Sequence, residues 1–122
     1  MPTLRFHGVS SALVQRVATQ LSPVLASIIK VEPDLFRYES VESTFISHAG
    51  QPIIVPPVYV ELLWFSRGQD IQDQVAVAVH KAVRDELARE GGREGGEGTL
   101  PDVILVGIQI EKHDYYKNGT HF

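Results

Sequence analysis

Cysteine is absent from all 122 residues of the chain, which excludes disulfides, thiol nucleophiles and cysteine-ligated metals. Long apolar runs are absent as well, since the longest, residues 103–106 and 53–57, are far too short to span a bilayer. Lysine and arginine form no cluster, and the net charge of -4 argues against a nucleic-acid partner. We therefore expect a soluble, cytoplasmic protein with no nucleic-acid or membrane partner, and we assign it no cofactor.

Metal and nucleophile motifs are also missing. The histidines form no ligand pair at helical or hairpin spacing, so we predict no metal site; they are His7, His48, His80, His113 and His121. The chain has no Gly-x-Ser-x-Gly elbow, and scattered Ser, His and Asp residues are given no weight. Residues 91–99 are rich in glycine and charge and predict a flexible loop, because the strand and helix that flank a phosphate-binding loop are lacking.

The N-terminal part of the chain predicts strand, helix and strand. Residues 3–7 alternate apolar and polar types, which is the period of a half-buried strand. Ser10 or Ser11 can cap a helix with an apolar stripe of Leu13, Val17, Leu21, Val24 and Ile28, widened by Val14, Ala18 and Leu25. Pro23 should kink or split this helix. Residues 35–47 are rich in aromatic and β-branched types and predict a long second strand.

The same order then repeats. Residues 58–65 predict a third strand, and Asp70 caps a second helix with an apolar face of Ile71, Val75, Ala78, Val79, Ala82 and Leu87. Residues 103–110 are almost continuously apolar, as in a strand covered on both faces. Right-handed crossovers in both units give an α+β fold, a four-stranded mixed sheet with both helices on one face. The other face would expose apolar side chains, which an oligomer could cover with the help of Trp64, Phe65 and the tail aromatics, although each could equally be core.

The connection between the two units separates two candidate folds. The ferredoxin-like fold has the same element order but joins its middle strands by a tight hairpin. Here residues 48–57 contain three prolines and a glycine, which predict a small projecting hairpin and an edge segment. We favour the repeat fold, and the ferredoxin-like alternative, which predicts a dimer, stays open.

Four features resemble the tautomerase superfamily, the group of 4-oxalocrotonate tautomerase and macrophage migration inhibitory factor. They are Met1-Pro2 opening a strand, the doubled unit, Arg37 at the start of the second strand, and the tail of residues 114–122. More narrowly, the Leu-Arg-Phe opening, residues 63–69 and the ending Tyr-Tyr-Lys-Asn-Gly-Thr-His-Phe are similar to an uncharacterised branch of that superfamily, a domain of unknown function. The resemblance covers residues 1–122 as a single domain.

The broader resemblance implies a homotrimer with an N-terminal proline in a pocket at each subunit boundary, catalysing keto-enol or double-bond shifts in small carboxylic substrates such as 2-oxo acids. If Met1 is removed, Pro2 becomes a secondary amine that could act as a general base. By position Arg37 matches the family's strand-two arginine, which would pair with the substrate carboxylate. Alternatively, Arg37 is a surface residue that forms an ion pair and has no role in binding. Arg67, Tyr115 and Tyr116 complete the candidate substrate-binding residues.

One alternative to catalysis stays open on the same fold. Pro57 begins the second unit much as Pro2 begins the first, but the Pro57 nitrogen is an amide and cannot act as a base. Catalysis at Pro2 therefore depends on cleavage of the bond between Met1 and Pro2. Without it, the same fold would serve as a non-catalytic oligomeric module that binds a ligand or partner in the cleft between subunits.

Overall fold

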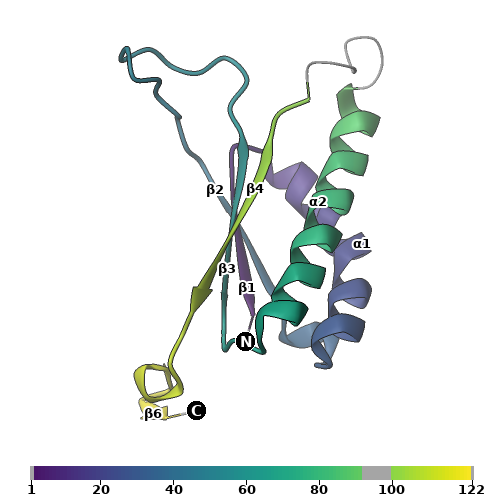
Figure 1. Ribbon diagram of the computed structural model, residues 1–122, viewed down its shortest axis with the longest axis vertical. Helices are drawn as coiled ribbons and strands as arrows, with labels where there is room; N and C mark the ends of the chain where they lie inside the picture. The colour runs from purple at the N-terminus through teal and green to yellow at the C-terminus, as the bar shows by residue number, and fades with distance from the viewer. Residues whose placement is uncertain (1, 92–99, 122) are drawn as a thin grey trace.

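The computed structural model describes residues 2–91 and 100–121, in which two long helices cover one face of a four-stranded sheet (Figure 1). The main elements are β1 (Thr3–His7), α1 (Ser11–Ile29), β2 (Arg37–Val41), β3 (Val58–Trp64), α2 (Gln69–Gly91) and β4 (Val103–Gln109). The described residues also include four short elements: the 3₁₀ helices η1 (Pro33–Leu35) and η3 (Lys112–Asp114), and the strands β5 (Tyr116–Lys117) and β6 (Thr120–His121).

The strands of the large sheet lie in the order β2-β1-β3-β4. β1 pairs with β2 in parallel, β3 pairs with β4 in parallel, and the two units meet where β1 runs antiparallel to β3. The predicted α+β fold of two strand-helix-strand repeats is therefore confirmed. The ferredoxin-like alternative is wrong, because β1 lies between β2 and β3 and no tight hairpin can join them.

The core lies between the sheet and the helices. Alternate strand residues point toward α1 and α2 and are fully buried, as the period of a strand requires: Leu4, Phe6, Val58, Val60, Leu62 and Trp64. α1 contributes Leu13, Val14, Val17, Leu21, Leu25 and Ile29. The predicted stripe on α1 is thus partly wrong, since the buried residues step mainly by four and Val24 is 46% exposed. By length and composition alone α1 would also pass as a membrane span, yet these six side chains belong to the core.

Two local predictions for α1 have different outcomes. Ser10 is the cap, because its hydroxyl accepts a hydrogen bond of 3.2 Å from the Leu13 amide. Pro23 does not split the helix, which continues from Ser11 to Ile29 as one element. Proline removes one main-chain donor. Buried residues lie on both sides of Pro23, so both halves of the helix pack against the core.

The connection between the units forms a projecting arm, residues 42–57, at the end of the sheet opposite the N-terminus (Figure 1). The predicted hairpin is present: Ile46 bridges to Pro52, and the Ile53 amide donates to the Phe45 carbonyl at 2.8 Å. The predicted strand over residues 35–47 is too long, because β2 ends at Val41 and the residues after it turn into the arm. Ile54 in the arm is 94% exposed.

The second unit also departs from the prediction at its edges. β4 is not covered on both faces; it is an edge strand in which Ile104 is 40% exposed. α2 begins at Gln69, so that Asp70 lies in its first turn and not at the cap. Val75, Val79 and Ala82 are buried as predicted. Residues 92–99 lie outside the described residues, so the loop expected over residues 91–99 stays a prediction.

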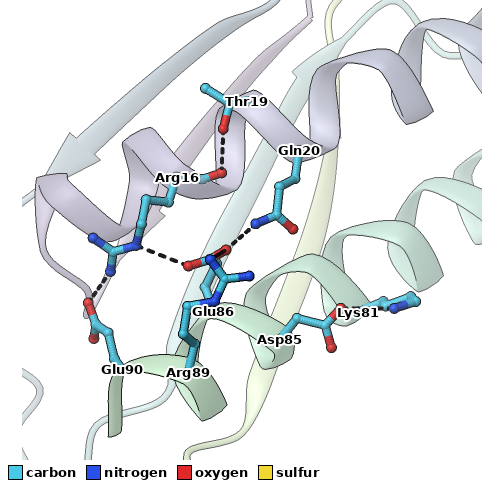
Figure 2. Close-up of polar contacts among 8 residues, drawn as sticks. All are labelled: Arg16, Thr19, Gln20, Lys81, Asp85, Glu86, Arg89 and Glu90. Carbon is cyan, nitrogen blue, oxygen red and sulfur yellow. Dashed lines mark hydrogen bonds and ion pairs between the residues drawn. The ribbon is translucent and has the colours of Figure 1, made fainter. Parts of the chain in front are cut away.

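Glu86 on α2 is the only buried charged side chain of the described residues, and the helical pattern did not reveal it. Figure 2 shows its carboxylate between the two helices, where it accepts from Arg16 Nε at 3.0 Å and from the Gln20 amide. Arg16 also bonds to Glu90, and the hydrogen bond to Glu86, followed by that to Glu90, raises the pKa of Arg16. A buried carboxylate needs such partners, so this cluster fixes α1 against α2.

Candidate functional site

Pro2 and Arg37 lie side by side at one end of the sheet. The Arg37 amide donates a hydrogen bond of 3.0 Å to the Pro2 carbonyl, one step before the parallel ladder of β1 and β2 begins. Pro2 is buried. Thr3 pairs with Leu63 across β1 and β3, and one further step in the same register sets Pro2 opposite Trp64. Pro2 therefore lies where the first strand starts and the third ends.

The Arg37 side chain is exposed and is held by the main chain of the preceding turn. Its Nη1 donates to the Asp34 carbonyl at 3.0 Å and to the Phe36 carbonyl at 3.2 Å. Both acceptors are neutral, so the guanidinium charge stays available to an anion. Among the described residues no carboxylate forms an ion pair with Arg37, unlike the surface pair considered from sequence.

Arg67 and Tyr115 gather around Phe65 at the same end of the sheet, because β3 and β4 are parallel and both finish there. Arg67 Nη1 donates to the Phe65 carbonyl at 2.8 Å. The Tyr115 ring meets the Phe65 ring edge-on, with centroids 5.3 Å apart, and the Lys112 ammonium lies 5.9 Å from the Phe65 centroid. The end of the sheet thus carries an aromatic pair with cations beside it.

Tyr116 lies outside this group. It belongs to the two-stranded β5-β6 tail, which Figure 1 shows beyond the end of the large sheet, and its side chain is 60% exposed. The predicted set therefore divides into Pro2 with Arg37, Arg67 with Tyr115 around Phe65, and Tyr116 on the β5-β6 tail.

Trp64 is fully buried, so it belongs to the core and cannot help to cover a subunit contact. Its indole Nε1 is the one buried side-chain polar atom in residues 2–91 and 100–121 without a hydrogen-bond partner. The sequence indicates a tryptophan near a strand end but not its orientation. Because Trp64 is set opposite Pro2, this orphan donor lies at the candidate end of the sheet.

The face of the sheet away from the helices is charged on one half and apolar on the other. Register places Glu39, Arg5 and Glu61 in one row across β2, β1 and β3. Arg5 Nε bonds to Glu39 Oε1 at 2.8 Å and its Nη1 lies 3.7 Å from Glu61 Oε1. The hydrogen bond to Glu39, and then the charge of Glu39, raise the pKa of Arg5.

The apolar half lies over β3 and β4, where Leu63, Val106 and Ile108 are half-buried on the same face. The expectation of apolar side chains on the open face is therefore mostly wrong for β1 and β2, and it holds for β4 and for Leu63 at the end of β3, whereas Glu61 of β3 belongs to the charged row. Alternation along β1 signals polar residues on this face, but not that they pair with residues of β3 and β2.

A cleft of about 970 Å³ opens at the other end of the sheet, between the start of α1 and the chain that leaves β2. It is lined mainly by small and hydroxyl-bearing residues, among them Gly8, Ser10, Ser11, Ser40, Ser43 and Thr44. None of the predicted site residues lines it. Serines at these separations have no sequence motif, so the sequence gives no signal for the cleft. The described residues hold no group of three His, Asp or Glu that could bind a metal ion.

Comparison with known proteins identifies relatives of the whole chain. A family model described as a domain of unknown function, DUF1904, matches residues 1–121. Among solved structures, a DUF1904 protein from Sebaldella termitidis is 24% identical with a TM-score of 0.80, and the match covers 100% of both chains. No curated protein matches the sequence.

Structures from the tautomerase superfamily share the same fold. A fused 4-OT symmetric trimer is 21% identical, with a TM-score of 0.69 and a match over 98% of this chain and 94% of that one. A macrophage migration inhibitory factor-like protein from Entamoeba histolytica is 12% identical, with a TM-score of 0.63 and coverage of 99% and 98%. At these identities the likeness concerns the fold, and it confirms the fold that the sequence resemblance implied.

Proposed function

The chain belongs to the DUF1904 family, and from that premise we propose that it is a cytoplasmic, homotrimeric tautomerase-like protein that interconverts keto and enol forms of small carboxylic substrates such as 2-oxo acids. In this proposal Pro2, freed by removal of Met1, is the general base and Arg37 binds the substrate carboxylate. The observation that carries it is the contact between the Arg37 amide and the Pro2 carbonyl, which places the two residues next to each other.

The surroundings of Pro2 suit a base. Burial disfavours the protonated form of an amine, so a free Pro2 nitrogen would be available to remove a proton from carbon beside a carbonyl. The negative charge that develops on the enolate requires a nearby cation or hydrogen-bond donor. Arg37 has only neutral main-chain acceptors and can supply one. Arg67 and Tyr115 lie at the same end of the sheet and extend the proposed substrate-binding surface.

The trimer in this proposal is supported by what a single chain leaves uncovered. β4 is an edge strand, and Leu63, Val106 and Ile108 form an apolar strip on the open face beside it. Contact with neighbouring copies would bury this strip and occupy the edge. The related fused 4-OT structure is described as a symmetric trimer, which favours the same arrangement here. Sedimentation of the untagged protein at three times the chain mass is expected; a monomer or dimer would contradict the trimer.

The test of the chemistry uses untagged protein. Intact mass reads whether Met1 has been removed, and the loss of the enol absorbance of a 2-oxo acid measures turnover. Pro2→Ala is expected to lower turnover by about 10²-fold or more, the usual contribution of a general base. Pro57→Ala is the matched control, because its nitrogen is an amide in every form of the chain. Equal turnover in wild type and Pro2→Ala would exclude the proline mechanism and favour the non-catalytic binding module.

Arg37 can be tested in the same assay. Arg37→Gln removes the charge, and we expect a higher KM for a carboxylate substrate because the bidentate pair is lost. Arg37→Lys keeps the charge without the planar fork and should restore part of the affinity. A KM unchanged by Arg37→Gln would assign the substrate carboxylate to another cation, for which Arg67→Gln is the next variant.

A further inference from the structure

His7, the last residue of β1, is hydrogen-bonded through both ring nitrogens. Its Nε2 lies 3.0 Å from Glu61 Oε1 on β3, and its Nδ1 lies 2.7 Å from Ser43 Oγ in the arm. A carboxylate only accepts, so the neutral ring donates its Nε2 hydrogen to Glu61 and leaves the Nδ1 lone pair toward the Ser43 hydroxyl. Glu61 thus orients the ring, His7 is placed to accept a proton, and Ser43 is placed to lose one. These are the roles of an acid, histidine and serine triad.

Ser43 is exposed and lines the cleft, whereas His7 and Glu61 lie behind it with side chains only 20% and 23% exposed. A hydroxyl with this arrangement faces an open space while its base is shielded from bulk water. The cleft also includes Ser11, the first residue of α1. Amides in the first turn of a helix have no partner within the helix and carry the positive end of its dipole. The Ser10 hydroxyl accepts from the Leu13 amide, so an oxyanion formed next to Ser43 would have the Ser11 and Ala12 amides at the start of α1 as donors.

We propose that Ser43, His7 and Glu61 form a serine-nucleophile site that hydrolyses small uncharged carboxylic esters bound in this cleft. The lining residues are rich in hydroxyls, include Glu42 and contain no lysine or arginine, which favours a neutral polar ester over a carboxylate anion. The site lies at the end of the sheet opposite Pro2 and uses none of the residues of the proposed tautomerase site.

The reaction balances without a co-reactant other than water. Ser43 Oγ attacks the ester carbonyl carbon while its proton moves to His7 Nδ1, and the carbonyl oxygen becomes an oxyanion facing the start of α1. The bond to the alcohol oxygen breaks, and His7 returns the proton to the leaving alcohol. Water then attacks the acyl-serine while giving a proton to His7 Nδ1. The bond between the acyl carbon and Ser43 Oγ breaks, His7 returns the proton to Oγ, and the carboxylic acid leaves. Glu61 is a positioning residue throughout.

Covalent labelling tests the nucleophile. Untagged wild-type protein is incubated with a fluorophosphonate, a reagent for activated serines, and intact mass with peptide mapping locates the adduct. We expect one adduct on Ser43, and Ser43→Ala should carry none. Ser66→Ala is the matched control and should label like wild type. Ser66 is also exposed and accepts a hydrogen bond from the Gly68 amide, but no histidine of the described residues is hydrogen-bonded to it. Absence of the adduct in wild type, or an adduct at another residue, would overturn the proposal.

The roles of the other two residues need rate measurements. His7→Gln is expected to slow labelling and p-nitrophenyl acetate hydrolysis by about 10²-fold or more, since the base is lost. Glu61→Gln should slow labelling and hydrolysis by a smaller factor than His7→Gln does, and it should alter their pH profiles. Glu61→Asp keeps a carboxylate and should restore part of both rates. A merely structural role for Glu61 would predict neither result. Unchanged rates in His7→Gln, with circular dichroism showing a folded protein, would overturn the proposal.

Discussion

The two faces of the sheet are built from the same strands but carry side chains of different chemistry and burial. On β1 and β3 the side chains that point toward the helices are apolar and fully buried, from Leu4 to Trp64. Most side chains on the other face of β1 and β2 are charged or polar, and Arg5 bonds to Glu39 there. Burial of apolar area is what holds the fold, whereas partnered polar groups at a half-open surface add little stability. The covered face therefore sets stability, and the open face is free to carry function.

Neighbouring residues of β1 give the largest test of this comparison, because Phe6 points to the helices and Arg5 away from them. Phe6→Ala should lower the free energy of unfolding by about 3–5 kcal/mol, since it leaves a cavity in the core. Arg5→Ala should cost no more than about 1 kcal/mol, because water screens its ion pairs. Urea unfolding followed by circular dichroism measures both. Equal losses would contradict the division between the faces.

Glu86 tests whether charge can also stabilise the covered side. Glu86→Ala should cost about 2 kcal/mol, since it removes the hydrogen bonds that the buried carboxylate accepts from Arg16 and Gln20 between the helices. Asp85→Ala is the matched control from the same helix: it breaks an exposed pair with Lys81 and should cost less than about 1 kcal/mol. The same urea experiment applies. A Glu86→Ala loss as small as that of Asp85→Ala would show that the cluster in Figure 2 adds nothing.

Tyr38 gives the smallest effect, and it depends on pH. Its hydroxyl is 2.9 Å from Ser22 Oγ, and its ring stacks on Phe6. Burial, only partly offset by the Ser22 hydrogen bond, raises the pKa of Tyr38 above its ordinary value of 10.0. The unfolded chain therefore loses this proton first, and the stability from Tyr38 is complete below about pH 10 and declines as pH rises through the folded pKa.

Tyr38→Phe removes this dependence. At neutral pH it should cost about 1 kcal/mol for the lost hydrogen bond, and above pH about 10 the difference from wild type should shrink. Thermal unfolding at a series of alkaline pH values measures it. A difference that widens with rising pH would mean that the sign of the pKa shift is wrong.

Local patterns in the sequence predict much of the fold, for reasons that the structure makes plain. Strand alternation in residues 3–7 and the Ser10 cap depend on neighbours within a few residues, so they can be read directly. The length of β2 could not be predicted from local sequence, because the β-branched and aromatic residues after Val41 suit an arm as well as a strand. Propensity gives the type of backbone but not where a sheet partner ends.

The candidate sites, like the fold, are partly predictable from the sequence. The position of Pro2 and Arg37 follows from the starts of two parallel strands, so a reading of the topology brings them together. The polar clusters depend on distant pairs: Ser43 and Glu61 are 36 and 54 residues from His7. Glu86 lies on a helical face that looks solvated until Arg16, 70 residues away, is placed against it. Such partners are set by packing and have no local signal.

The arm of residues 42–57 is the single covalent link between the two units, and it supplies no strand to the large sheet. New chain ends could therefore be opened at Gly50, with the old ends joined by a linker, while every strand keeps its neighbours. In such a circular permutant the nitrogen of Pro2 would be an amide for good, whatever happens to Met1. A circular permutant can thus keep the architecture while removing the free amine that catalysis at Pro2 would require.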